Sequence, residues 1–304
     1  MQSVIVNNIV KTYEHGKITA LRDVSFAVEK GEIFGLIGPD GAGKTSLFRI
    51  LTTLLLADSG TATVEGFDVV KNYKAIRKQI GYMPGRFSLY QDLSVEENLQ
   101  FFATIFGTSI SENYDLIRDI YVQIEPFKTR RAGKLSGGMK QKLALCCALI
   151  HKPTVLFLDE PTTGVDAVSR KEFWEMLKKL RERGITILVS TPYMDEASLC
   201  DRVALLQNGQ FLDIDAPLSI RRKFDRLLWS VRSAEMFRLL NDLKNFEQTE
   251  SCFAFGDAHH LTLKNQAVGE SEIKNFLQLK NHQAIEIKRI EPTIEDCFMA
   301  LMKK

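Results

Sequence analysis

Hydrophobic residues recur along this chain of 304 residues with two different spacings, which predict where strands and helices lie. Three short apolar runs, rich in β-branched residues, predict buried central strands at residues 32–37, 155–158 and 186–189. Longer segments with helical spacing separate these runs, which is typical of a mostly parallel sheet covered by helices. We therefore expect an α/β fold.

Two features are added to this core. Residues 4–6 and 24–28 alternate between apolar and polar side chains, as strands do when one face meets water, and so predict an antiparallel β flap before the core. From residue 95 to about residue 152, apolar residues such as Leu99, Phe102 and Phe106 recur at helical spacing. This segment predicts a helical subdomain inserted into the α/β core.

The pattern changes after Pro217, so we expect a domain at 1–217 and a second one at 218–304. The predicted elements of the second domain are a strand at 227–231, a helix from 234, strands near 253 and at 261–263, a helix from 271, and a strand at 285–290. The order β-α-β-β-α-β predicts a small α+β module of ferredoxin-like type, followed by a last helix. We expect this module to be an accessory domain.

Composition and charge narrow the functional classes. Hydrophobic residues make up 45% of the chain and charged residues 26%, which is ordinary for a globular protein. The formal charge of +2 gives no indication of a nucleic-acid partner. Residues 1–10 show no secretory signal, so we expect a cytoplasmic location. The longest apolar runs, such as 143–150, fall far short of the roughly twenty residues that span a bilayer, so any membrane association is expected to be peripheral, through another protein.

The first chemical motif follows the run at 32–37 directly and satisfies the P-loop pattern GxxxxGK[ST]. It consists of Gly38, Pro39, Asp40, Gly41, Ala42, Gly43, Lys44 and Thr45, followed by Ser46. Glycines let backbone N–H groups converge on phosphate oxygens, and the following helix directs its positive end at the same charge. We expect Lys44 to bridge the β- and γ-phosphates, Thr45 to ligate Mg²⁺ and Ser46 to donate to a phosphate oxygen. The motif predicts nucleotide binding but does not separate a kinase, a GTPase and a transport ATPase.

Two carboxylates, Asp159 and Glu160, follow the apolar run at 155–158. They are therefore expected at the carboxyl edge of the sheet, where ligands bind in such folds. Asp159 could hold Mg²⁺ through water, and Glu160 could orient and polarise the water that attacks the γ-phosphate, as a catalytic residue beside Lys44. A solvated turn is the alternative. The position downstream of a P-loop favours the catalytic interpretation.

Between these motifs lie Leu135, Ser136, Gly137 and Gly138, which open a helical segment. Ser136 resembles an N-cap, and the glycines expose amide donors at the positive end of a helix, which predicts a second anion site. With this segment the chain resembles the ATP-binding subunits of ABC transporters, whose signature is LSGGQ. Met139 stands where Gln is commonest.

The resemblance covers about residues 2–217 and implies a function. In that family the signature of one subunit covers the γ-phosphate held by the P-loop of another, so Mg-ATP joins two subunits, identical or related. The resemblance further implies that Tyr13 stacks on adenine, a surface tyrosine being the alternative, and that Asp166 lies in a loop that crosses the dimer interface. It implies an ATPase that powers a separate membrane-spanning subunit.

Further segments resemble the branch of the family that exports drugs, lipids or polysaccharides; they lie at 87–98, 190–197 and 291–298. Within the first, exposed Phe87, Leu89 and Tyr90 could line a groove for a cytoplasmic helix of the membrane subunit, or they could be buried between subdomains. The main alternative function is an ABC protein that acts as an ATP-dependent regulatory or scaffold subunit without transport. An ordinary P-loop kinase leaves the LSGG segment unexplained.

Two positions depart from the family pattern. Gly85 stands where the family has a Gln near Mg²⁺ and the attacking water, and Pro192 stands where it has a His that donates to the γ-phosphate. Glycine has no side chain for this role, and proline has no donor at all. Losing a preorganised donor typically costs about a hundredfold in rate. We therefore expect ATP to bind well but to be hydrolysed slowly, unless a neighbour such as Arg86 compensates, while Ser136 and its glycines complete a partner's site.

Overall fold

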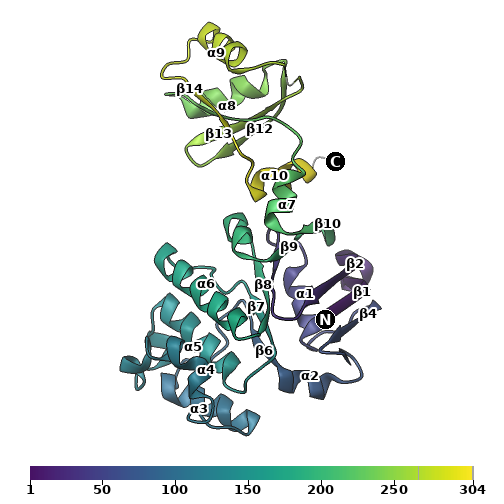
Figure 1. Cartoon of the computed structure of the whole chain (residues 1–304), viewed down its shortest axis with the longest axis vertical. Helices are drawn as coiled ribbons and strands as arrows, with labels where there is room; N and C mark the ends of the chain where they lie inside the picture. The colour runs from purple at the N-terminus through teal and green to yellow at the C-terminus, as the bar shows by residue number, and fades with distance from the viewer. Residues whose placement is uncertain (266, 303–304) are drawn as a thin grey trace. The chain divides into compact units, whose positions relative to one another are not determined.

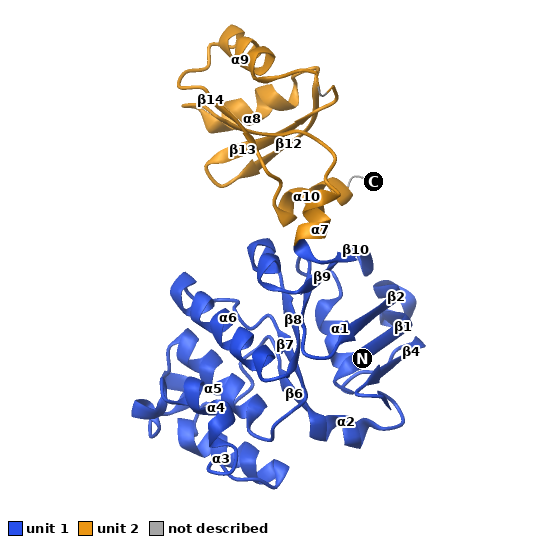
Figure 2. Ribbon diagram, viewed as in Figure 1, with its two compact units in different colours: residues 1–217 blue, residues 218–304 orange. Residues whose placement is uncertain are grey.

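The computed structural model describes residues 1–265 and 267–302. They form two compact units, Met1–Pro217 and Leu218–Lys304, drawn in different colours in Figure 2. Among the helices in the described ranges, none combines the length and the apolarity that crossing a bilayer requires.

Six strands form the central sheet of the first unit, in the order β10-β9-β3-β8-β7-β6. They are β3 (Ile33–Ile37), β6 (Ile80–Met83), β7 (Val155–Asp159), β8 (Thr186–Thr191), β9 (Arg202–Gln207) and β10 (Gln210–Asp215). Neighbouring strands are parallel, except that β10 pairs with β9 antiparallel. Every residue of β3, β7 and β8 is buried, which is why these strands read as continuous apolar runs. The predicted α/β class is confirmed.

A second sheet, of order β2-β1-β4-β5, is antiparallel. Its strands are β1 (Gln2–Tyr13), β2 (Ile18–Glu29), β4 (Ser59–Val64) and β5 (Phe67–Asp68). The predicted antiparallel flap is therefore confirmed. Helix α1 (Lys44–Leu51) lies between the two sheets (Figure 1), where its buried residues join a core to which both sheets contribute. Helix α2 (Tyr73–Gln79) precedes β6.

The segment between β6 and β7 is helical. It contains α3 (Val95–Phe106), α4 (Tyr114–Tyr121) and α5 (Gly137–Leu149), with short 3-10 helices at Glu125–Phe127 and Ala132–Lys134. Ser94 starts α3 with a reciprocal capping box to Glu97, and Gly107 ends it in the left-handed conformation. Helix α6 (Ala167–Glu182) follows β7 and packs on β3 and β8.

The second unit contains a four-stranded antiparallel sheet of order β12-β13-β11-β14. Its elements in chain order are β11 (Leu228–Arg232), α8 (Met236–Lys244), β12 (Thr249–Phe255), β13 (Ala258–Leu263), α9 (Glu270–Leu279) and β14 (Glu286–Ile290). Helices α8 and α9 bury Leu239, Leu243, Ile273 and Leu277 in a core shared with the sheet. The short helix α7 (Pro217–Arg222) precedes this β-α-β-β-α-β order and α10 (Ile294–Leu301) follows it.

Candidate nucleotide-binding site

The loop between β3 and α1 needs glycine at two positions because other backbone lies against it. A Cβ atom added at Gly38 would come within 2.2 Å of the carbonyl oxygen of Leu206, and one added at Gly43 within 2.3 Å of that of Ala20. Gly43 also has φ +112°, which L side chains rarely adopt. The glycines of the motif therefore fit the loop tightly between β2 and the end of β9.

Lys44 is the first residue of α1 and is only 3% exposed. Its Nζ donates to the carbonyl oxygens of Gly38 at 2.8 Å and Pro39 at 3.0 Å. It also lies 3.1 Å from Oε1 of Glu160. The ammonium group therefore faces three oxygen acceptors, the atom type that a nucleotide phosphate presents. This contact joins the P-loop lysine and the second carboxylate, which are 116 residues apart in the sequence.

The two carboxylates lie at the carboxyl end of β7, as predicted for this edge of the sheet. Asp159 is 2% exposed, and its Oδ1 accepts a hydrogen bond from the hydroxyl of Ser190 at 2.6 Å. Glu160 has φ +51°, uncommon for a residue with a side chain, and its N–H donates to the carbonyl oxygen of Ser190 at 3.0 Å. Ser190, at the end of β8, thus holds both acidic residues, a role that no sequence motif indicated.

The donor set beside this edge suits a hard cation. Thr45 in the first turn of α1 offers a hydroxyl and Asp159 a carboxylate, and oxygen ligands of this kind match Mg²⁺. The nearby Tyr82 cannot supply a phenolate at neutral pH. Burial, and then the negative charge of Asp159, raise the pKa of Tyr82 to about 12.

Tyr13, at the end of β1, is half-buried and lies beside the P-loop helix. Its hydroxyl is 3.0 Å from the hydroxyl of Ser46, and the Nζ of Lys11 lies 5.7 Å from the centre of its ring. The structure thus brings Tyr13 and Ser46 together, so Ser46 bonds to a protein side chain in this arrangement.

The LSGG segment opens α5. The Ser136 hydroxyl accepts from the N–H of Met139 at 3.3 Å as an N-cap, and both Ser136 and Gly137 are exposed. Leu135 is 6% exposed and packs in the core, so its side chain is poorly placed for the predicted contact with a partner's ATP. A Cβ atom added at Gly138 would lie 2.7 Å from the hydroxyl oxygen of Ser169, so α5 starts in close contact with α6.

Asp166 is exposed and also caps α6. Its Oδ1 accepts from the N–H groups of Val168 at 3.1 Å and Ser169 at 3.0 Å. The bond from Ser169 is the largest cause that lowers the pKa of Asp166 below its ordinary value. The carboxylate therefore stabilises the helix start, a role that sequence reasoning missed although Asp before a helical segment is a capping signal.

The two departures from the family pattern lie at the same edge of the sheet. The backbone of Gly85 lies against Asp159, because a Cβ atom added at Gly85 would be 3.1 Å from the carbonyl oxygen of Asp159. Pro192 follows Thr191, whose carbonyl oxygen accepts from the N–H of Gly38 at 3.4 Å. Arg86 is exposed and makes no hydrogen bond or ion pair with any residue that the structure describes.

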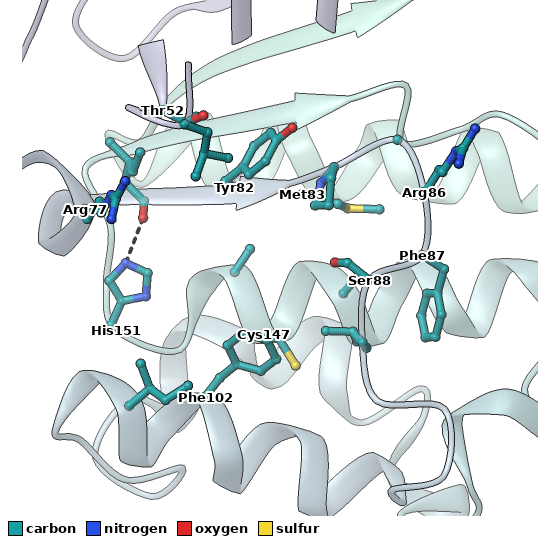
Figure 3. Close-up of a pocket in the computed structure, with 18 of the residues that line it drawn as sticks. Thr52, Arg77, Tyr82, Met83, Arg86, Phe87, Ser88, Phe102, Cys147 and His151 are labelled. Carbon is teal, nitrogen blue, oxygen red and sulfur yellow. Dashed lines mark hydrogen bonds between the residues drawn. The ribbon is translucent and has the colours of Figure 1, made fainter. Parts of the chain in front are cut away.

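A groove of about 460 Å³ lies beside the site, bounded by β6 and its following loop, α3 and α5 (Figure 3). Its lining is mostly apolar and includes Tyr82, Met83, Phe87, Leu89, Phe102, Ile105 and Phe106. The expectation that Leu89 is exposed is wrong, since it is 7% exposed, whereas Phe87 is half-buried. Tyr90 is 51% exposed but lies outside the lining. Leu89 is therefore buried and still contributes to the lining of the groove.

His151 closes one end of this groove. Its ring stacks on Phe106 with centroids 3.7 Å apart, and its Nε2 lies 3.0 Å from the carbonyl oxygen of Ile80, a contact drawn as the dashed line in Figure 3. Burial lowers the pKa of His151, which favours the neutral ring. The groove is therefore apolar, with a neutral imidazole at one end and Arg86 among its other lining residues.

Comparison with known proteins agrees with this geometry. Residues 21–163 match the family described as ABC transporter. The chain is 37% identical over 98% of its length to a probable multidrug ABC transporter ATP-binding protein, YbhF of Escherichia coli K12, but spans only 52% of that relative. It is 39% identical over 64% of its length to the ABC transporter ATP-binding protein NatA of Bacillus subtilis, of which it covers 81%.

A solved structure has a similar fold. It is the dimeric post-hydrolysis state of the ATP-binding cassette MJ0796 bound to ADP and Pi, with a TM-score of 0.63 and 26% identity over 70% of this chain and 98% of the cassette. The P-loop, the acidic pair and the LSGG helix therefore occur in a cassette fold. The relatives named above match the part of the chain that contains these motifs. The chain belongs to the ABC transporter ATP-binding proteins.

Proposed function

We propose that this chain binds Mg-ATP at the P-loop and powers an export system through a separate membrane-spanning subunit. The ion pair between Lys44 and Glu160 carries the proposal, because it places a phosphate-binding lysine beside the residue suited to orient the attacking water. Thr45 and Asp159 would hold Mg²⁺, which neutralises phosphate charge when bound. Residues 218–304 would be an accessory domain of this subunit.

Hydrolysis at this site is proposed to be slow. Gly85 contributes only backbone beside Asp159, and Pro192 has neither a side-chain nor a backbone donor at the turn after β8. The acidic pair and the lysine remain in place, so the chain keeps the residues that we propose for binding Mg-ATP. We therefore expect this subunit to bind ATP well but to hydrolyse it slowly.

The exposed Ser136 and Gly137 support pairing with a second ATP-binding subunit, because they stand at the start of α5, where helix amides could meet a phosphate held by another chain. MJ0796, which shares the fold, is described as dimeric. The pair could be built from two copies of this chain or from this chain and a related subunit.

The apolar groove supports a membrane partner. It has a volume of about 460 Å³ and presents aromatic and aliphatic side chains from α3 and the loop after β6, the kind of surface that receives the apolar face of an amphipathic helix. Relatives of this chain are described as multidrug and Nod factor export ATP-binding proteins. We propose that a cytoplasmic helix of the membrane subunit occupies the groove.

Equilibrium titration with a fluorescent ATP analogue and Mg²⁺ tests the nucleotide proposal. We expect the wild-type chain to bind and Lys44→Ala to bind about tenfold or more weakly, because the buried ammonium is lost. Lys71→Ala, at an exposed lysine in the turn between β5 and α2, is the matched control and should bind like wild type. Equal binding by Lys44→Ala and wild type, or no binding by wild type, would contradict the proposal.

Co-purification from native membranes tests the groove. Ile105 is 59% exposed and lines it, so Ile105→Glu should lower recovery of a membrane-spanning chain while ATP binding persists. Val122→Glu, a similarly exposed position outside the lining, is the control. Unchanged recovery with Ile105→Glu would rule out this docking site.

A further inference from the structure

A buried carboxylate near the site makes contacts that binding and hydrolysis, as derived above, leave unused. Glu196 is 2% exposed and lies in the 3-10 helix η4 (Met194–Leu199), directly after the turn that contains Pro192. Its Oε2 accepts from the hydroxyls of Thr191 at 2.6 Å and Thr162 at 3.1 Å. Its Oε1 makes no hydrogen bond and faces Nε of Arg170 at 3.5 Å.

Each of these three contacts reaches a different part of the site. The carbonyl oxygen of Thr191 accepts from the N–H of Gly38, the first residue of the P-loop. Thr162 lies two residues after Glu160, whose carbonyl oxygen holds the following turn through the N–H of Thr163 at 3.2 Å. The carboxylate thus connects the start of the P-loop with the segment that carries the acidic pair.

The third contact leads away from the P-loop, to the first turn of α6. Arg170 is in the first turn of α6, next to Ser169, whose hydroxyl lies against Gly138 at the start of α5. Gly164, in the loop between β7 and α6, also lies near the start of α5. A Cβ atom added at Gly137 would be 3.5 Å from the carbonyl oxygen of Gly164. A shift of the loop after β7, or of α6, would therefore displace atoms that lie against the first turn of α5.

Arg170 has a second, exposed set of contacts that offers a comparison. Its guanidinium pairs with Asp195 at 2.7 Å and lies 4.5 Å from the centre of the Tyr193 ring. The side chain of Asp195 is 69% exposed, so water can replace this pair at small cost. Water reaches Glu196 far less, so loss of its contacts leaves buried groups without partners.

We propose that Glu196 is a positioning residue that transmits nucleotide binding at the P-loop to the LSGG end of α5. This inference rests on the proposed binding of Mg-ATP. Binding shifts the backbone around Gly38, and Glu196 moves Thr162 and Arg170 with it, so that the exposed amides of Ser136 and Gly137 become ordered for a second subunit. Because the turn after β8 has Pro192 in place of a donor, this buried network supplies the connection without a side chain on the phosphate.

Hydrogen exchange with Mg-ATP, read by mass spectrometry at dilutions where light scattering finds a single chain, tests the proposal. In wild type, Mg-ATP should slow exchange in peptides that cover 38–46, 160–170 and 136–141. In Glu196→Gln the single amide oxygen cannot serve both the threonines and Arg170. We expect ATP affinity within about twofold of wild type but loss of most of the slowing at 136–141, as for a contact that orients rather than binds.

Two variants make the result decisive. Thr162→Val removes one hydroxyl without changing the shape of the side chain, and it should reduce the slowing of exchange at 136–141. Adding Thr162→Val to Glu196→Gln should cause no further loss of this slowing, because both residues act through one network. Asp195→Asn removes only the exposed partner of Arg170 and should behave like wild type. If Glu196→Gln is too unstable to study, Thr162→Val alone decides the outcome.

The possible results separate this inference from the proposed function. A wild-type chain that fails to bind Mg-ATP would refute both. Binding by wild type without a change at 136–141, or an undiminished change in Thr162→Val and Glu196→Gln, would overturn the role of Glu196 and leave ATP binding standing. A parallel loss of affinity and remote slowing would make Glu196 a general structural residue and would also overturn the proposal.

Discussion

The Nζ of Lys44 lies 3.1 Å from Oε1 of Glu160, so the P-loop lysine and the residue after β7 form an ion pair across the edge of the central sheet. The lysine is buried and the glutamate side chain is 23% exposed. A γ-phosphate placed between them is attracted by the ammonium and repelled by the carboxylate. Lys44 therefore raises the affinity for ATP, and Glu160 lowers it.

Glu160→Gln should bind ATP roughly tenfold more tightly, because the repulsion of the γ-phosphate is removed, while ATP turnover falls below detection. ADP lacks the γ-phosphate, so its affinity should change much less. Titration with both nucleotides and a phosphate-release assay measure this. Glu172→Gln, which breaks a surface pair with Lys142, serves as the control. Equal tightening of ATP and ADP would show that Glu160 does not face the γ-phosphate.

Gly43→Ala should lower the free energy of unfolding by about 3 kcal/mol or more, since the new Cβ atom meets the carbonyl oxygen of Ala20 in a backbone conformation that already disfavours alanine. Gly41→Ala is the matched control. Gly41 also has a positive φ, but its Cβ would meet nothing within 4 Å, so about 1 kcal/mol is expected. Urea unfolding of the two variants compares them, and similar losses would argue against the close approach at Gly43.

Asp58 should contribute stability that depends on pH. Its carboxylate accepts from Nζ of Lys11 and from the N–H and hydroxyl of Thr12, and these bonds, the one from Lys11 first, lower its pKa from 3.8 to about 2. A lowered pKa in the folded state gives stability that is complete above the unfolded value. The stability is lost as the pH falls from about 4 to about 2.

The difference in Tm between wild type and Asp58→Asn should therefore be constant from pH 5 to pH 7 and shrink below about pH 4. Asp23→Asn, at an exposed aspartate of β2 that accepts a hydrogen bond from Asn8, provides a comparison. A difference for Asp58→Asn that persists unchanged at pH 2.5 would mean that the bonds to Lys11 and Thr12 do not form in solution.

Restoring the two missing side chains should raise ATP turnover. The double variant Gly85→Gln, Pro192→His is expected to turn over ATP about a hundredfold faster, with ATP affinity little changed, because each new donor acts mainly on charge that develops during the reaction. The glutamine is tight but feasible, since its Cβ would lie 3.1 Å from the carbonyl oxygen of Asp159. Steady-state phosphate release measures the effect.

Adding Glu160→Gln to that double variant is the control and should abolish the gain. A double variant that hydrolyses ATP no faster than wild type, although it folds and binds ATP, would contradict the slow-site proposal. It would then point to a different limiting group, such as Arg86.

Several elements were readable from the sequence because their burial is simple. Strands β3, β7 and β8 are covered on both faces and form continuous apolar runs, and the P-loop and LSGG segments combine glycine with a helix start at fixed spacing. Strand β9 was not predicted, although it carries a similar signal at 203–206, where four apolar residues are buried. Strand β4 is largely exposed at its start and gave no clear alternation.

The sequence by itself determined the fold class and the family, and it predicted the phosphate-binding, carboxylate and signature residues, because these depend on local spacing and on residue type. Only the tertiary structure decided which of them meet. Lys44 reaches Glu160, Ser190 holds Asp159, and Glu196 gathers Thr162, Thr191 and Arg170. The physical reason is that parallel strands distant in sequence end at one edge of a sheet, so loops with no local pattern of their own exchange hydrogen bonds there.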